Sequence, residues 1–262
     1  MSTYRLVDMH CHVDRMANAA EVASEARNLG LVLFDTTVTP EDNATARQIF
    51  DNAENIRVGI GLHPWWVAGG ETDNGSRKNA NAADRAALLA ASAQYVGEVG
   101  LDFSPRHQVS APQQIQAFEL IMAACAERPI AGRIISIHAV QAARTVLDIL
   151  ERFDLTHQAS CMFHWFSGTS DELVRARTCG CLFSVNARML NSKRGREYAR
   201  QIPEQQLLIE TDAPPQLDSP YHAQAIVEEL DATLDSLAEL RDTDRGHLSR
   251  VIAERSIALL GL

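Results

Sequence analysis

The amino-acid sequence predicts an α/β fold, a single (β/α)8 TIM barrel that spans residues 1–262. Apolar segments of strand length alternate with helical segments about eight times, which indicates a parallel sheet covered by helices. No shift in composition divides the chain, and a length of 262 residues suits one barrel. The runner-up is an open, doubly wound sheet. It is disfavoured because no Gly-x-Gly-x-x-Gly motif follows the first strand.

Local signals place the individual elements. The run from Leu31 to Phe34 is continuously apolar, as a strand buried on both faces would be. Gly30 suits the end of one helix, and Pro40 suits the first position of the next. The expected strands are the first strand with its exit at 6–14, then 31–34, 56–62, 95–102, 133–138, 160–164, 181–185 and 206–212. Helices are expected at 19–29, 40–50, 84–93, 113–127, 141–153, 172–178, 194–201, 222–240 and 245–260, and an irregular loop at 68–82.

Composition places the chain among soluble globular proteins. Hydrophobic residues make up 46% and charged residues 22%, and no apolar run approaches the roughly 20 residues that span a bilayer. The chain enters its first strand too early for a signal peptide, so we expect a cytoplasmic protein without a membrane partner. Five cysteines without a Cys-x-x-Cys pair indicate neither a disulfide framework nor a zinc knuckle. The net charge of −10 argues against a broad basic surface for duplex DNA, although bound cations would still admit a phosphate substrate.

The exit of the first strand carries two histidines. His10 and His12 are two positions apart, so on an extended chain their side chains point to the same face. Imidazoles held side by side are a common start to a metal site. An isolated His-x-His is equally well explained as a strand end where a histidine only satisfies a hydrogen bond. The interpretation therefore depends on ligands from elsewhere in the chain.

Five further polar residues stand at the C-terminal ends of later strands: His63, Glu98, His138, His164 and Asp212. In a (β/α)8 barrel these ends converge on the face that carries the active site. Even without His63, four histidines and two carboxylates exceed what one zinc ion needs. They suit two divalent metal ions that share a bridging carboxylate, polarise a phosphoryl group and activate water. Zn, Mn, Co or Fe(II) fits such donors, and Mg fits if waters complete its shell.

Five short motifs at these strand ends strengthen the prediction. They are Asp8-Met9-His10-Cys11-His12-Val13-Asp14, Gly61-Leu62-His63-Pro64, Gly97-Glu98-Val99-Gly100-Leu101-Asp102, His164-Trp165-Phe166-Ser167-Gly168 and Glu210-Thr211-Asp212-Ala213-Pro214. In this order they resemble the TatD-like metal-dependent deoxyribonucleases, which are barrels of the metal-dependent hydrolase (amidohydrolase) type. The match covers residues 6 to about 215. Three segments, at 132–138, 163–168 and 186–190, also resemble QatD, the TatD-type member of the Qat anti-phage defence systems.

The resemblance implies a role for each strand-end residue. The first metal would be held by His10 and His12, and the second by His138 and His164, with Glu98 as the bridge between them.

The catalytic residues implied by the resemblance are Asp212, Glu98 and His63. Asp212 would serve as a metal ligand or as the general base toward the attacking water. His63 would contact substrate phosphate near the metals; the other explanation is a structural hydrogen bond at the barrel rim.

Two departures from the family pattern leave the substrate open. Relatives usually follow Thr-Asp-Ala-Pro with an aromatic residue, a leucine and an Arg…Asn-Glu-Pro stretch, whereas residues 215–222 run directly into a helix here. Many relatives also place Ser-Arg after the histidine of the fifth strand, where this chain has Ala139-Val140. The metal ligands are unaffected, but a phosphate-binding arginine is missing from that position.

Aromatic and basic residues near the predicted rim are candidates for substrate contact. They are Trp65, Trp66, Trp165, Arg106, Arg188, Lys193 and Arg194. Aromatic rings can stack unpaired bases, worth about 1–3 kcal/mol each, and basic groups suit phosphates. Rim packing and a solvated helix face are the ordinary alternatives. Because the net charge is negative and these groups are local, they favour single-stranded DNA or DNA ends over duplex DNA bound along its length.

Three hypotheses about function stay open. The leading one is a divalent-metal-dependent DNA phosphodiesterase that trims DNA ends, in a Qat-type defence system with other Qat proteins as partners. The second is a metal-dependent amidohydrolase acting on a small amide, lactone or modified nucleotide, since the same metals activate water for acyl transfer. No lysine stands at a strand end to form a carbamate bridge, which favours Glu98 as the bridge. The third is a non-catalytic, metal-binding subunit of a defence complex.

Overall fold

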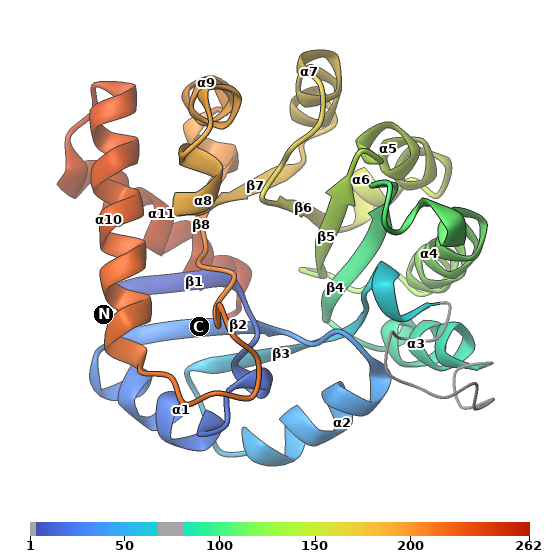
Figure 1. Ribbon diagram of the computed structural model, residues 1–262, viewed down its shortest axis with the longest axis horizontal. Helices are drawn as coiled ribbons and strands as arrows, with labels where there is room; N and C mark the ends of the chain where they lie inside the picture. The colour runs from blue at the N-terminus through green and yellow to red at the C-terminus, as the bar shows by residue number, and fades with distance from the viewer. Residues whose placement is uncertain (1–3, 68–80) are drawn as a thin grey trace.

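The computed structural model describes residues 4–67 and 81–262, which form a parallel barrel surrounded by helices (Figure 1). Eight strands pair in chain order, each with the next. They are β1 (Leu6–Cys11), β2 (Leu31–Thr36), β3 (Ile56–Leu62), β4 (Tyr95–Asp102), β5 (Ile134–Val140), β6 (Ser160–His164), β7 (Leu182–Val185) and β8 (Leu207–Ile209). The predicted (β/α)8 fold class is confirmed.

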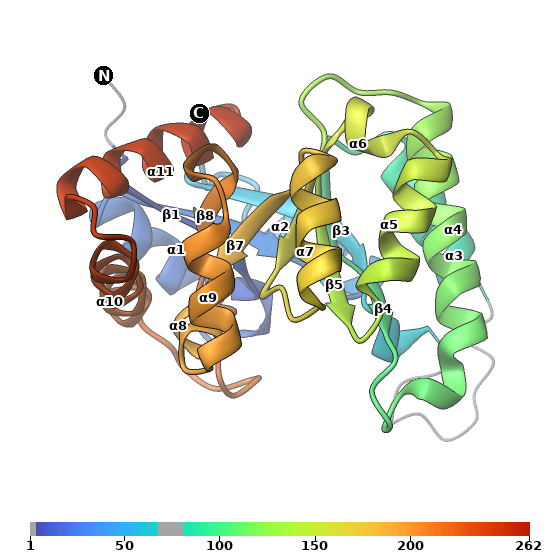
Figure 2. The same ribbon diagram turned by 90° about the horizontal axis from the view of Figure 1, so that it is seen from above.

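Helices connect the strands and cover the outside of the barrel. They are α1 (Ala19–Asn28), α2 (Pro40–Ile49), α3 (Ala82–Ala91), α4 (Ala111–Glu127), α5 (Ala143–Arg152), α6 (Leu155–Gln158), α7 (Ser170–Thr178), α8 (Ala187–Leu190), α9 (Lys193–Gln201), α10 (Ala223–Arg241) and α11 (Arg245–Leu259). Short 3-10 turns include η1 (Val13–Arg15), η2 (Pro64–Trp66), η4 (Gln108–Ser110) and η5 (Glu204–Gln206). Figure 2 shows α10 and α11 beside β1 and β8. None of the helices within the described ranges is long and apolar enough to cross a membrane.

Most predicted boundaries lie within two residues of the observed ones. The expected last strand, 206–212, is an exception, because β8 ends at Ile209 and the chain then leaves the ladder toward the site. The single-turn helices α6 and α8 were not predicted, since four residues are too few to show helical periodicity. Most of the expected loop at 68–82 lies outside the described residues.

Backbone hydrogen bonds close the barrel between the exits of β8 and β1. The N–H of Asp212 donates to the carbonyl of His10 over 2.9 Å, and the N–H of His12 donates to the carbonyl of Ala213 over 2.7 Å. Below them, the buried Asp8 carboxylate accepts hydrogen bonds from the backbone N–H and the hydroxyl of Thr211. These contacts fix Asp212 beside the two histidines of β1.

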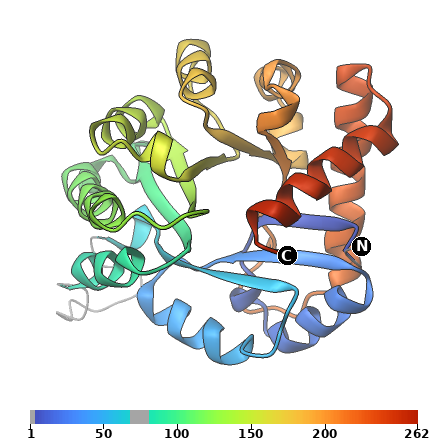
Figure 3. The same cartoon turned by 180° about the vertical axis from the view of Figure 1, so that it is seen from behind.

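The N-terminal half of the barrel interior is packed with apolar side chains. They are Val7, Met9, Val32, Phe34, Ile134, Met162, Leu182, Leu208 and Leu260. Leu260 follows α11, which crosses this end of the barrel (Figure 3). Its carbonyl accepts hydrogen bonds from Tyr95 Oη and Arg57 Nε at the starts of two strands. A filled lower half leaves the C-terminal ends of the strands for a functional site.

Candidate metal centre

A cavity of about 630 Å³ opens at the C-terminal ends of the strands. Six of the seven predicted strand-end residues line it: His12, His63, Glu98, His138, His164 and Asp212. The seventh, His10, is fully buried, and its ring stacks on that of His164 with centroids 3.9 Å apart. Residues from six different strand ends are therefore brought together in one place.

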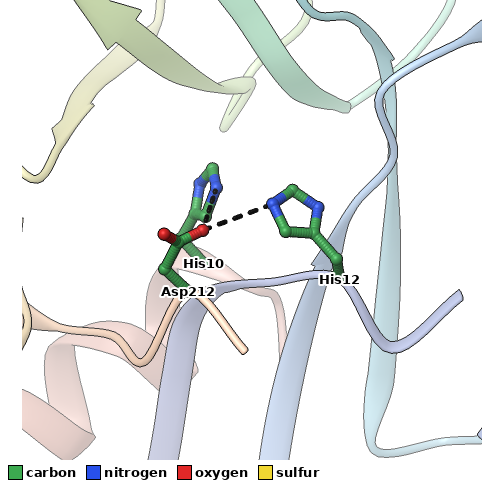
Figure 4. Close-up of side chains that lie close together, drawn as sticks. All are labelled: His10, His12 and Asp212. Atoms are coloured by element: carbon green, nitrogen blue, oxygen red, sulfur yellow. Dashed lines mark ion pairs between the residues drawn. The ribbon is translucent and has the colours of Figure 1, made fainter. Parts of the chain in front are cut away.

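One ligand set lies at the junction of β1 and β8 (Figure 4). Asp212 Oδ1 is 3.4 Å from His12 Nε2 and 3.9 Å from His10 Nε2. On the other side, Glu98 Oε2 is 3.3 Å from His12 Nε2 and 3.7 Å from His10 Nε2. Two imidazole nitrogens and two carboxylate oxygens thus face one another, a donor set typical of divalent transition metals.

An irregularity in β1 aims both histidines into the cavity. Val7 and Met9 pack in the barrel interior. On a regular strand Cys11 would share their face, yet it packs outward among the helices. The pairing of β1 with β2 shifts register between Asp8 and Cys11, so the alternation of faces reverses there. His10 and His12 flank Cys11 and consequently point inward. Unbroken alternation from the start of β1 would have turned them toward the helices.

The second oxygen of Glu98 faces the other ligand set. Glu98 Oε1 lies 3.0 Å from both His138 Nδ1 and His164 Nε2, and these two nitrogens are 3.2 Å apart. One carboxylate therefore presents one oxygen to each histidine pair. Gly100 permits this close approach of β4 and β5: its φ is +145°, and a Cβ there would lie 2.0 Å from the carbonyl oxygen of His138.

The remaining nitrogen of each histidine faces an outer partner. The pairs are His10 Nδ1 with Ser136 Oγ at 2.7 Å, His12 Nδ1 with the Thr36 carbonyl at 2.7 Å, His138 Nε2 with Asp102 Oδ2 at 3.5 Å, and His164 Nδ1 with Glu210 Oε1 at 3.6 Å. A carbonyl can only accept, so His12 donates from Nδ1 and offers Nε2 to a metal. The pair of histidines on β5 and β6 has carboxylate partners, which orient imidazoles and raise their basicity.

The donors fit divalent metal ions. His10 Nε2 is buried and has no hydrogen-bond partner within residues 4–67 and 81–262, although two carboxylates lie beyond it. A buried nitrogen without a partner is costly unless a ligand completes it. Histidine and carboxylate donors also gather in three overlapping groups within ion-binding distance of one another. Buried histidine–glutamate clusters of this kind are consistent with a binuclear centre.

The carboxylates and histidines shift one another's pKa values. Burial favours neutral His164, but its contacts with two glutamates outweigh this and raise its pKa to about 10. Burial is likewise outweighed at His12, whose pKa is raised well above its ordinary value by two carboxylates. The surrounding histidines overcome burial at Glu98 and hold its pKa well below normal. Burial, followed by repulsion from His164, lowers the pKa of His10 to about 3. Glu98 is therefore ionised, and a metal ion must displace protons from the site.

His63 differs from the other histidines of the site. Its Nδ1 accepts the backbone N–H of Trp65 at the start of η2, so the ring proton belongs to Nε2. Nε2 lies 3.2 Å from Glu98 Oε1. Burial lowers the pKa of His63 to about 4, which keeps the ring neutral. His63 thus directs its Nε2–H toward the Glu98 carboxylate, beside the second ligand set.

The predicted substrate-binding residues divide into two groups. Four of them line the cavity: Trp65, Trp66, Trp165 and Arg188. The other three, Arg106, Lys193 and Arg194, are exposed and lie outside the cavity lining. For Lys193 and Arg194, the density of basic residues in the sequence did not reveal this, because consecutive residues of a helix such as α9 point in different directions.

Several residues of the site were not singled out from the sequence. Asp102 and Glu210 belong to the strand-end motifs, and their position beside known ligand types could have marked them as partners of histidines. Thr36 and Ser136 carry no such signal, because one contributes its backbone carbonyl and the other an ordinary hydroxyl. Arg15, in η1, also lines the cavity and lies over the ring of Trp66.

Histidines and carboxylates gathered at this rim of a barrel are the donors that metal-dependent hydrolases use, and the fold and donor set of this chain fit that class of enzyme. Over residues 7–261 the sequence matches the family described as TatD related DNase. The chain belongs to this family.

Individual relatives agree with the family match. A protein named 3'-5' ssDNA/RNA exonuclease TatD, from Dickeya dadantii (strain 3937), is 30% identical over 206 residues, which cover 76% of this chain and 72% of the relative. A protein of the same name from Edwardsiella piscicida is 34% identical over 155 residues, 57% of this chain and 58% of the relative. The solved structure of YJJV, a TatD homolog from Escherichia coli k12, superimposes with a TM-score of 0.79 at 19% identity and covers 99% of both chains. A TatD family hydrolase from Entamoeba histolytica gives a TM-score of 0.77 at 16% identity over 98% of both chains. At these identities the two structures support the fold.

Proposed function

We propose that this enzyme is a divalent-metal-dependent phosphodiesterase that trims the ends of single-stranded DNA. The observation that carries the proposal is Glu98, which presents one oxygen to each of two histidine pairs. Two metal ions bound in this way polarise a phosphoryl group and activate water. The names of the relatives, which describe exonucleases for single-stranded DNA and RNA, support the substrate class.

Each of the seven predicted strand-end residues has a role in this proposal. The metal ligands are His10, His12, Glu98, His138, His164 and Asp212. The neutral His63 donates its Nε2–H to a non-bridging oxygen of the phosphate. Hydrogen bonding to His12 and nearby histidine charge outweigh burial at Asp212 and lower its pKa, so this carboxylate is ionised and accepts the proton of the attacking water.

The cavity suits an unpaired strand end. Trp65 is 49% exposed, and its ring is held in place by a 2.7 Å hydrogen bond from Nε1 to Asp102 and by stacking on His107. Trp66 and Trp165 line other parts of the same cavity. Each ring that stacks a base contributes about 1–3 kcal/mol. A volume of about 630 Å³ is typical of small-ligand sites, so one or two splayed nucleotides fit it better than duplex DNA.

The test uses purified protein with Mn²⁺ or Mg²⁺ and end-labelled DNA. We expect metal-dependent shortening of single-stranded oligonucleotides, slower reaction on blunt duplex, and loss of activity with a chelator. Changing both His10 and His12 to alanine should lower the rate at least about a hundredfold. His157→Ala is the matched control, because this exposed histidine lies outside the cavity. Inactivity with every divalent ion, or an active double variant, would refute the proposal.

We also propose that the enzyme acts in a Qat-type anti-phage defence system with other Qat proteins. The support is the resemblance of three segments to QatD. Two residues of the third segment contact the metal centre: Asn186 Nδ2 donates to Glu210, and Arg188 pairs with Asp212. Phage plating on cells that carry the complete gene cluster tests this. Defence should be lost when His10 and His12 are both alanine; unchanged defence would contradict the proposal.

A further inference from the structure

We propose that Arg188 is the phosphate-binding residue of the site, and that before substrate arrives it is held as the counter-ion of Asp212. Substrate phosphate would then share the guanidinium with Asp212. This inference rests on the proposed function and names the residue through which the site recognises a phosphodiester.

The first support is the position of Arg188 at the rim. Its Nη1 lies 3.2 Å from Asp212 Oδ2, and its guanidinium carbon lies 5.7 Å from the centroid of the Trp165 ring. The side chain is 37% exposed and lines the cavity, so it can reach both the carboxylate and a bound ligand. Guanidinium groups bind phosphates through two parallel hydrogen bonds, which makes arginine well suited to this task.

The second support is that the structure holds the Arg188 backbone in place from beneath the metal centre. Asn186 caps the short helix α8, because its Oδ1 accepts the N–H of Met189 over 2.8 Å. The amide nitrogen of the same side chain donates to Glu210 over 2.8 Å. Glu210 in turn faces His164. Arg188 thus lies two residues after Asn186, whose side chain is connected through Glu210 to a histidine of the second ligand set.

The third support is backbone strain in both partners of Arg188. Trp165 has a φ of +41° and Asp212 a φ of +59°. Such left-handed conformations are unusual for residues other than glycine, above all for one as large as tryptophan, and they concentrate at functional sites. Hydrogen bonds from each backbone N–H hold them: Trp165 donates to Ser184, and Asp212 donates to His10. The segments that follow β6, β7 and β8 therefore bring together the Trp165 ring, the Arg188 guanidinium and the Asp212 carboxylate.

The two oxygens of Asp212 have different neighbours. Oδ1 faces His10 and His12, whereas Oδ2 pairs with Arg188. The positive charge of Arg188 opposes the binding of a metal cation to this carboxylate. A phosphodiester in the cavity offers Arg188 a second anion, and sharing the guanidinium weakens its hold on Asp212. The same residue is thus placed to contact both the substrate phosphate and Asp212.

Other cationic groups near the cavity are less suited. Arg15 also lines the cavity, but it pairs with Asp42 over 3.3 Å and lies 4.0 Å from Asp14. Ala139 and Val140, which follow His138 in the lining, carry no charge. Of these two arginines that line the cavity, Arg188 is therefore the one that pairs with Asp212, a proposed metal ligand.

The test compares Arg188→Met, which keeps length and packing but removes charge, with Arg188→Lys, which keeps charge but loses the two-pronged contact. Arg196→Met, an exposed change in α9, is the control. For single-stranded DNA, the KM should rise about tenfold or more in Arg188→Met, by less in Arg188→Lys, and not in the control. In the absence of DNA, Arg188→Met should bind Mn²⁺ about threefold or more tightly, because Asp212 has lost its competing cation.

These two effects have opposite signs, which separates the proposed role from a structural one. A residue that only supports the fold would weaken metal binding and substrate binding together, and would lower the melting temperature. The inference is overturned if both Arg188 variants show this combined loss, or if the KM of Arg188→Met stays within twofold of the wild-type value. Titration of the Mn²⁺-loaded protein with inorganic phosphate tests Arg188 without any nuclease reaction. If wild-type protein cleaves no DNA but binds phosphate tenfold better than Arg188→Met, the proposed function fails and the role of Arg188 stands.

Discussion

Substitution of Asp102 is a sensitive test of the second ligand set, which His138 and His164 form. Its Oδ2 accepts the Trp65 indole N–H over 2.7 Å and lies 3.5 Å from His138 Nε2, while Oδ1 accepts the backbone N–H of Ser104 over 2.8 Å. Asp102→Asn preserves volume but removes the negative charge that faces His138. It also leaves only one carbonyl oxygen for two donors, because the amide nitrogen cannot accept.

Two magnitudes follow for Asp102→Asn. Loss of an outer carboxylate behind a metal-binding histidine typically weakens metal affinity 10- to 100-fold, which equals about 1.4–2.7 kcal/mol. One part-buried donor without an acceptor should lower the free energy of unfolding of the metal-free protein by about 1 kcal/mol. Of these two effects, only the change in metal affinity tests the proposed role of Asp102, because it is expected only if His138 binds a metal ion.

Chelator competition with Mn²⁺ or Zn²⁺ measures the affinity, and urea unfolding measures the stability. Asp154→Asn is a matched control, because Asp154 also contacts a histidine, His157, on the exposed surface. The control should leave metal affinity unchanged. If Asp102→Asn keeps its metal affinity within twofold of wild type while its stability falls, Asp102 has only a structural role and the reasoning fails.

Three further predictions concern the same centre. Glu98→Gln should retain at most one metal ion per chain, because no other side chain faces both histidine pairs among the described residues; two ions by elemental analysis would contradict this. Metal affinity should fall as the pH is lowered from 8 to 6: the raised pKa values of His138 and His164 mean that protons bind there in competition with metal. Calorimetry in buffers of different ionisation enthalpy counts the protons released, and zero release would be inconsistent with these shifts. Gly100→Ala should destabilise the fold by about 3 kcal/mol or more, since its Cβ would meet the His138 carbonyl at a φ of +145°; thermal melting with an unchanged midpoint would argue against it.

The fold was predictable because its signals are local and repeated. Apolar strands such as Leu31–Thr36 alternate with helices, and few topologies accommodate eight such units. Because the C-terminal ends of barrel strands converge on one face, the sequence also predicts that distant residues such as His10 and Asp212 meet at one rim. The exact end of β8 was not predictable, since residues 210–212 keep a strand-like sequence while their backbone turns away to bond with β1.

The details of the site were less accessible from the sequence. The two-residue spacing of His10 and His12 indicated a shared face, but only the register shift in β1 explains why that face is the inner one. The carbonyl of Thr36 could not be anticipated, because every residue has one. The directions of arginine side chains were equally hidden: Arg188 points into the cavity, whereas Arg194 on α9 is exposed. Such features depend on tertiary geometry and not on residue type.

We propose that Glu98 bridges two divalent ions held by the histidine pairs of β1 and of β5 with β6. Anomalous X-ray diffraction from crystals grown with Mn²⁺ tests it most directly. We predict two peaks about 3.5–4 Å apart with the Glu98 carboxylate between them. A single peak, or two peaks with Glu98 bound to only one ion, would contradict the two-metal account.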